Sequence, residues 1–233
     1  GAAGVSFTRT TYVVGRLDVS GGGSLSASAI HYTTVLPRVS SGRYDVTTTH
    51  VAGRVVLTEN EALPATTKLV VPVDTSLRLN GHELDVGGEL SVSFSDNPGD
   101  GLQMKDESDL LTVRQKASFV VPGAQASATS DGSFKAGEIH FKGDFAQENH
   151  SSGSGRSFVA TGTTCFFDGD EAQQIHFGTP GLSTSHFHGL VFDNAASITL
   201  TSDVVAKGDV VVTSGTSVRA TRDLDLNLGL SVN

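Results

Sequence analysis

Polar turn residues divide the chain into short β-rich runs at close, recurring intervals. Between residues 166 and 215, runs of 3 to 6 residues alternate with Gly, Asn, Asp, Ser and Thr, and the turns recur every 8 to 12 residues. None of these runs is long enough for a helix, and none has a 3.6-residue apolar period. This rhythm is typical of a β-solenoid, in which each turn of chain adds a few short strands to stacked sheets. We therefore predict an all-β protein with a parallel β-helix over at least residues 66–215.

The composition and charge fit this class and exclude some partners. The chain has 233 residues, 27 of them Gly, and a formal charge of −9. An acidic surface has little with which to neutralise phosphates, so we expect neither nucleic acid nor an anionic membrane as a partner. Because no run approaches 18 apolar residues, we also expect no membrane-spanning segment.

The single cysteine and the first residues bear on location. Cys165 lies inside an apolar run, which predicts a buried free thiol and no intrachain disulfide. The chain begins with Gly1 and has no initial Met, which resembles the end left after removal of a signal peptide, although an arbitrary boundary would look the same. We expect an extracellular or bacterial cell-surface protein.

A five-residue unit recurs along the chain: Gly, a charged residue, an aliphatic residue, any residue and a large apolar residue. In a strand, the third and fifth residues of this unit point to the same side. We therefore predict that three such pairs occupy equivalent core places: Leu90 with Val92, Ile139 with Phe141, and Val210 with Val212. The five copies begin at Gly15, Gly53, Gly88, Gly137 and Gly208.

Two longer stretches also match. Residues 69–92 and 190–212 both run strand, turn, strand, turn, strand, glycine, strand, and we interpret them as equivalent coils of one solenoid. Residues 1–65 are the least repeat-like part, so we separate an N-terminal β region, 1–65, from a solenoid body, 66–233. A β-sandwich remains an alternative for this N-terminal third. The acidic stretch 95–109 is expected to be a loop with one helical turn near 103–110.

Five segments in order resemble a module of large bacterial surface and secreted proteins. The segments are 137–145 (GEIHFKGDF), 157–167 (SFVATGTTCFF), 169–177 (GDEAQQIHF), 187–194 (FHGLVFDN) and 197–208 (SITLTSDVVAKG). The resemblance covers residues 70–140 and 157–215, about half of the chain. It implies a right-handed parallel β-helix in an adhesive or structural protein, and it implies no active site.

Two groups of residues are candidate metal sites. His186 and His188 share one face of a strand, with His176 ten residues earlier, so their imidazoles could meet one ion. Asp96 and Asp100 begin the acidic stretch and carry the oxygen ligands that calcium prefers. Neither group has the spacing of a known metal motif. We expect exposed histidines flanking a buried Phe187, a solvated acidic loop, and no metal or other cofactor.

Three classes of function remain open. A polysaccharide-active enzyme needs convergent carboxylates or a base, whereas the acidic residues here lie mostly in turns, so we expect no catalytic residues. An adhesin that recognises a glycan or a surface would show aromatic and long polar side chains on one face. A structural protein would self-associate through its terminal strands.

The terminal segments favour self-association into a homopolymer. Residues 4–14 form a Thr/Val/Tyr-rich strand without acidic residues, and 223–232 read as one strand with five apolar residues on one face. An uncapped solenoid end exposes unpaired N–H and C=O groups that can template another chain. A head-to-tail contact of this kind would produce a filament. The alternative is that both strands complete their own solenoid.

Overall fold

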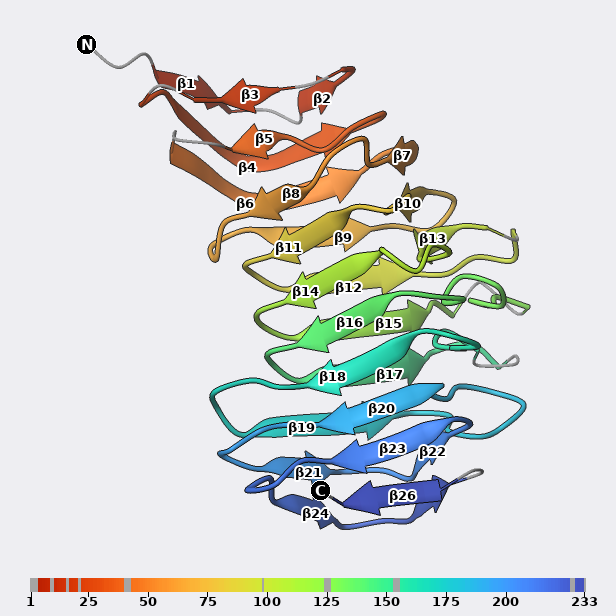
Figure 1. The fold of residues 1–233 in the computed structure, drawn as a ribbon. Helices are drawn as coiled ribbons and strands as arrows, with labels where there is room; N and C mark the ends of the chain where they lie inside the picture. The colour runs from red at the N-terminus through yellow and green to blue at the C-terminus, as the bar shows by residue number, and fades with distance from the viewer. Residues whose placement is uncertain are drawn as a thin grey trace.

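The computed structural model is an all-β, parallel β-solenoid of about nine turns, as predicted (Figure 1). The structure describes residues 4–8, 11–15, 17–20, 22–39, 43–97, 99–123, 127–152, 156–226 and 229–232, with the backbone alone for 38–39, 226 and 229–232. Over these ranges, no helix is long and apolar enough to span a bilayer.

Successive coils pair along three sides of the solenoid. One side is an 11-stranded parallel sheet, here the long sheet. Its strands are β1 (Gly4–Phe7), β2 (Thr11–Val13), β4 (Ser24–Tyr32), β6 (Arg43–Val51), β9 (Lys68–Val71), β12 (Leu90–Ser93), β15 (Ala117–Val121), β17 (Phe145–Asn149), β19 (Gln173–Phe177), β21 (Ile198–Leu200) and β24 (Val218–Ala220).

The second side is an 8-stranded parallel sheet, here the second sheet, and a short pair of strands stands near its N-terminal end. The sheet comprises β8 (Glu61–Leu63), β11 (Glu83–Val86), β14 (Leu110–Val113), β16 (Glu138–Phe141), β18 (Thr164–Phe167), β20 (Gly189–Phe192), β23 (Asp209–Val212) and β26 (Gly229–Val232). The pair is β3 (Asp18–Val19) with β5 (Arg38–Val39).

The third side is less regular. It starts with β7 (Arg54–Val56), β10 (Ser76–Arg78) and β13 (Gly101–Gln103), and it ends with β22 (Val204–Ala206) and β25 (Leu224–Leu226). Between them, single bridges replace strands, among them Met104 with Phe134, Phe134 with Ala160, and Phe187 with Ala206. The predicted helical turn near 103–110 is wrong, because β13 and the following Met104 are buried parts of this ladder.

Phenylalanine fills the core. Ten of the 12 Phe side chains are buried, and most of them form one continuous cluster in the middle and C-terminal coils. Phe145 is central: its ring lies 5.1 Å from that of Phe158 and 5.2 Å from those of Phe141 and Phe187, between centroids. Edge-to-face and tilted contacts of this kind add to the burial of apolar area.

The glycine of the five-residue unit, except in the first copy at Gly15, lies where neighbouring coils approach each other. Gly137 has a φ of 78°, and a Cβ there would collide with the carbonyl oxygen of Asp109 in the preceding coil. A Cβ at Gly88 would likewise collide with the Thr67 carbonyl oxygen. Glycine is therefore needed at these positions for close coil-to-coil approach.

The predicted core pairs are buried, but they are not all equivalent. Leu90, Val92, Ile139, Phe141 and Val210 are at most 1% exposed, and Val212 is partly buried. The pairs in β16 and β23 belong to the second sheet, whereas Leu90 and Val92 belong to the long sheet. The match of 69–92 with 190–212 is offset for the same reason, since β9 starts one stretch on the long sheet and β20 starts the other on the second sheet. In both sheets, a strand that follows a corner carries inward apolar residues at alternate positions. Strands of the two sheets therefore have similar sequences.

The N-terminal strands continue the long sheet and do not form the alternative β-sandwich. β1, β4 and β6 pair in parallel, and β6 pairs in parallel with β9 across the predicted boundary at 65/66. In β4 the buried residues are Leu25, Ala27, Ile30 and Tyr32, so the inward phase slips by one residue at 28–29. β6 slips at the matching place, 47–48. Each of these strands therefore has two halves with different phases.

The tail is not a single strand. Residues 218–232 form β24, β25 and β26, which pair in parallel with β21, β22 and β23 as a further coil. The predicted apolar face at 224–232 lies largely outside the residues whose side chains are described. Likewise, 4–14 form two strands, β1 and β2, which both pair with β4.

Candidate functional site

His186 and His188 flank Phe187 on the third side, but the expectation that both are exposed is wrong. His186 is 1% exposed, and His188 is half-buried. The segment 178–185 turns back over His186, and Pro180 bridges Ser185 within it. The bridge residues on this side are thus covered by a loop that the local sequence pattern does not reveal.

The His186 ring is partly satisfied. Its Nδ1 lies 3.3 Å from the Gly181 carbonyl oxygen, so Nδ1 carries the proton and donates it. Its Nε2 is buried without a hydrogen-bond partner. Burial lowers the pKa of His186 to about 4, and the positive charge of Lys207 acts in the same direction. The ring is therefore neutral at pH 7.

The acidic stretch is built into the coil, and its carboxylates accept hydrogen bonds from backbone N–H groups and a hydroxyl. Asp100 is 7% exposed and accepts a hydrogen bond of 2.6 Å from the Ser95 hydroxyl. Asp96 accepts one of 2.8 Å from the Ser127 backbone N–H. Asp109 is buried and accepts from the N–H groups of Gly81, Lys105 and Asp106. The predicted solvated loop is wrong for Asp100 and Asp109, because both carboxylates tie down backbone.

The described part of the chain contains no group of three or more His, Cys, Asp or Glu side chains placed to hold a metal ion. His176 is exposed, and its Nδ1 lies 3.3 Å from the Thr201 hydroxyl. The structure therefore does not bring the predicted histidines and aspartates into one site.

A cluster that sequence reasoning missed lies on the outer side of the second sheet. The Asp168 carboxylate is 2.8 Å from His140 Nδ1 and 2.7 Å from Lys142 Nζ. The His140 ring stacks on Phe166 with 4.5 Å between centroids and 1° between planes. His140 and Phe166 are register partners in β16 and β18, and Lys142 and Asp168 follow those strands.

A signal for this cluster was present in the sequence. Residues 141–144 and 167–170 both read Phe-x-Gly-Asp, with Lys142 and Asp168 at the variable position. Stacking these two stretches as adjacent coils would have placed the lysine beside the aspartate.

The cluster is electrostatically coupled. The hydrogen bond that His140 Nδ1 donates to the Asp168 carboxylate raises the pKa of His140 against the opposing effect of burial. Burial works to raise the pKa of Asp168, but the hydrogen bonds from His140 and Lys142 outweigh it and lower that pKa. His140 Nε2 lies 3.6 Å from the Glu138 carboxylate, which can accept a proton but completes no Ser or Cys triad. The arrangement ties adjacent coils together by charge.

The only cysteine is next to Phe166 in β18, but it lies on the buried side of the strand and takes no part in this cluster. Cys165 is fully buried, and burial raises the pKa of its thiol well above the usual range. A thiol in this state is a poor nucleophile. It packs as a small apolar residue in the core, as predicted.

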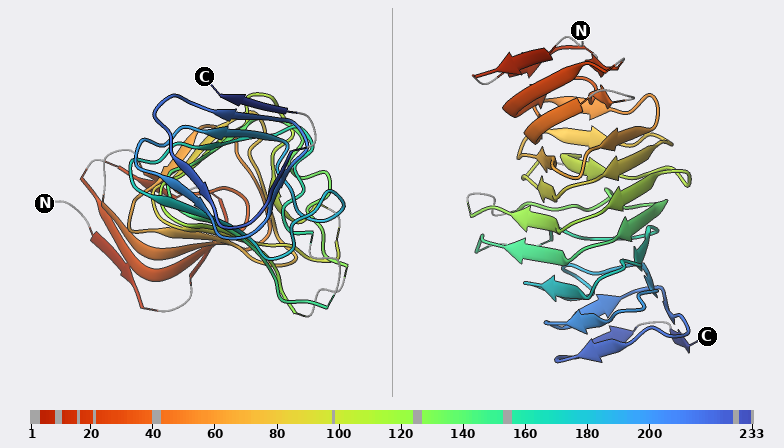
Figure 2. Two further views of the ribbon diagram at one scale, coloured as in Figure 1. Left: turned by 90° about the horizontal axis from the view of Figure 1, so that it is seen from below. Right: turned by 90° about the vertical axis from the view of Figure 1, so that its left-hand side faces the viewer.

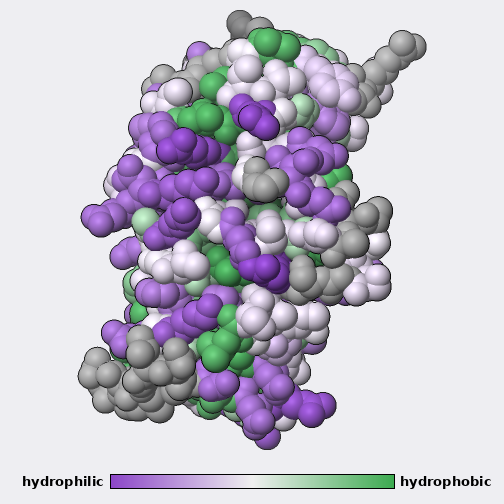
Figure 3. All heavy atoms as spheres, turned by 90° about the vertical axis from the view of Figure 1, so that its right-hand side faces the viewer, coloured by the Kyte–Doolittle hydropathy of each residue, from purple (hydrophilic) through white to green (hydrophobic). Residues whose placement is uncertain are grey.

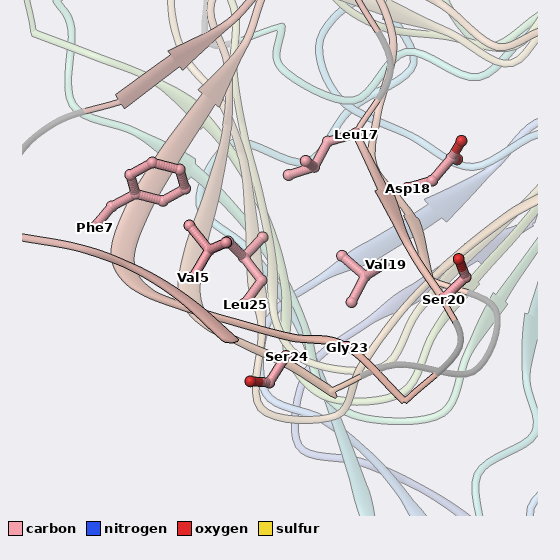
Figure 4. Close-up of a pocket in the computed structure, with 9 residues that line it drawn as sticks. All are labelled: Val5, Phe7, Leu17, Asp18, Val19, Ser20, Gly23, Ser24 and Leu25. Carbon is pink, nitrogen blue, oxygen red and sulfur yellow. The ribbon is translucent and has the colours of Figure 1, made fainter. Parts of the chain in front are cut away.

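The clearest candidate for an interaction site is an opening at the N-terminal end, here the N-terminal opening. It has a volume of about 290 Å³ and is lined by side chains from β1, β3 and the start of β4, with the residues that connect them. Val5, Phe7, Leu17, Val19 and Leu25 point toward one another across it (Figure 4). Apolar side chains of the first two coils thus line a hollow at this end.

Exposed apolar side chains gather at the same end. The described residues include five exposed large hydrophobic side chains, and three of them lie in the first coil: Val5 at 52%, Tyr12 at 65% and Val14 at 80% exposure. The right-hand side of Figure 1 is by contrast mostly hydrophilic, with small separate apolar groups (Figure 3).

Comparison of the chain with protein-family models, with curated proteins and with solved structures finds no match.

Proposed function

We propose that this protein is a structural, non-catalytic unit of an extracellular or bacterial cell-surface assembly, and that copies associate through their terminal coils. The observation that carries the proposal is the concentration of exposed apolar side chains in the first coil, one of which, Val5, also lines the N-terminal opening. Such a surface on a soluble protein is typical of an interaction site. The turn-and-strand motifs similar to right-handed β-helix modules of bacterial surface proteins support the location and the handedness that we propose.

Backbone edges support the same proposal. β1 and β2 form one edge of the long sheet and β24 the other, and each of these strands pairs with a single neighbour among the described residues. Unpaired edge groups favour the addition of a strand from another chain, with affinity supplied by main-chain hydrogen bonds. Polar side chains elsewhere, such as Asp109 and Asp168, are engaged in holding coils together, which suits a scaffold.

The proposal is tested by light scattering on the purified protein across the micromolar range. We expect the parent protein to form dimers or larger species, and Val5→Asp to shift it toward monomer because the new charge lies at the apolar opening. Val56→Asp is the matched control, since Val56 is also an exposed valine but lies on the third side. Circular dichroism checks that both variants stay folded. A parent protein that is monomeric throughout this range would refute the proposal.

A further inference from the structure

The two ends of the solenoid differ in shape. The first halves of β1, β4 and β6, namely 4–7, 24–27 and 43–46, pair in register and form a three-stranded wall, here the N-terminal wall. The wall stops at β6, because β9 pairs only with Thr48, Thr49 and His50. Viewed along the solenoid axis, these red and orange strands extend beyond the outline of the later coils (Figure 2).

Among the residues that the structure describes, the N-terminal wall and the lining of the opening carry little charge. The strands β1, β2 and β4 contain no Asp, Glu, Lys or Arg. The wall holds one ion pair, Arg43 with Asp45 at 2.6 Å on β6, one coil away from the β4 edge of the opening. Among the residues that line the opening, Asp18 alone is charged. The surface formed by these described residues therefore fits an apolar, nearly neutral partner.

The C-terminal end does not meet this requirement. Its last described coil exposes Arg219, Arg222, Asp223 and Asp225. A head-to-tail contact would press these charges toward an apolar opening, and burial of charges without matched partners is costly. The same contact would leave the wall uncovered, because the C-terminal coil has no wall of its own.

We propose that the N-terminal end binds the N-terminal end of a second copy, in a two-fold, head-to-head contact. This inference rests on the proposed self-association and fixes its polarity. The free edge of β1 meets the partner's β1 edge in antiparallel orientation, so that the two walls form one continuous sheet and the two openings face each other. Isologous contacts of this kind are the commonest in homo-oligomers, and they place like on like, which a neutral surface tolerates. This contact closes at a two-fold pair, in place of the head-to-tail filament expected from the sequence.

Cysteine cross-linking distinguishes the two polarities. The native Cys165 is buried and does not react, so single cysteines can be introduced at Ser6 on β1 and at Ala220 on β24, both exposed. Each variant is treated with a short bismaleimide, alone and as an equimolar mixture of the two. Ser118→Cys, in the middle of the long sheet on its outer side, is the control for random collision.

Head-to-head association predicts a covalent dimer from Ser6→Cys alone, at a yield at least several-fold above the Ser118→Cys control, and the loss of this dimer when Val5→Asp is added. A product that forms only in the mixture of Ser6→Cys and Ala220→Cys would overturn the inference and keep the proposed function. Oligomers by light scattering with no cross-link at Ser6 would also overturn it. A monomeric parent protein would refute both.

Discussion

Acidification is expected to destabilise this protein through His186. The ring is held beneath the segment 178–185, where Nδ1 donates to Gly181 and the buried Nε2 has no partner. A second proton would place a charge in this buried site beside Lys207, which is why the pKa of His186 falls to about 4. In the unfolded chain the ring is free in water, with a pKa of about 6.5.

The size of the effect follows from linkage. Because the folded pKa lies below the unfolded one, the unfolded chain takes up its proton first as the pH falls. The free energy of unfolding therefore decreases between about pH 6.5 and pH 4, and this contribution levels off below pH 4. Each pKa unit corresponds to about 1.4 kcal/mol, so the difference between about 6.5 and about 4 amounts to about 3 kcal/mol.

The test compares the parent protein with His186→Asn by urea unfolding, followed by far-UV circular dichroism at pH 4, 5, 6 and 7. Asparagine keeps a donor near the position of Nδ1 but does not titrate. We expect the stability advantage of the parent over the variant to shrink by about 3 kcal/mol from pH 7 to pH 4. His188→Asn, which retains His186, should keep the parent's pH dependence. A parent–variant difference that changes by less than about 0.5 kcal/mol over this range would refute the burial argument.

Three further predictions follow from the core, the charge cluster and the acidic stretch. Ile139→Ala should lower the free energy of unfolding by about 2 to 5 kcal/mol in urea, because it leaves a cavity in the core, and a loss below about 0.5 kcal/mol would contradict the inward register. The pKa of His140, followed by NMR, should fall in Asp168→Asn, since the Asp168 carboxylate raises it; the stabilisation from this pair is present below about pH 6.5 and is lost as the pH rises through the folded pKa. An unchanged His140 titration would show that the pair does not form in solution. Stripping divalent ions with a chelator should leave the melting temperature within a degree or two, whereas a drop of many degrees would make 95–109 a metal site.

The sequence by itself determined the fold class and the inward residues of the body. Alternation of apolar and polar residues sets which side of each short strand is buried, and this rule needs only the two-residue period of a strand. Ile139, Phe141 and Val210 were identified in this way, and all are buried. The glycine before these strands also recurs in the sequence, and the structure supplies the reason, because close approach between coils excludes a Cβ there.

The tertiary structure decided which side of the solenoid each strand joins. Leu90 follows the same local pattern as Val210 but lies in the long sheet, because the side that a strand reaches depends on the summed lengths of the preceding corners and strands. It also decided the phase slip in β4 and β6. The spacing of Leu25, Ala27, Ile30 and Tyr32 breaks strict alternation, but only the paired neighbours show that both strands slip together and form a wall.

The candidate sites depended on tertiary structure for the same reason. His186 is buried by a loop that folds back over it, and Lys142 meets Asp168 only because their coils stack in register. The N-terminal opening combines side chains from several segments, and no single strand carries its pattern. In a solenoid, residues about one coil apart become direct neighbours, so local periodicity determines the strands, and the length of each coil determines which side chains meet.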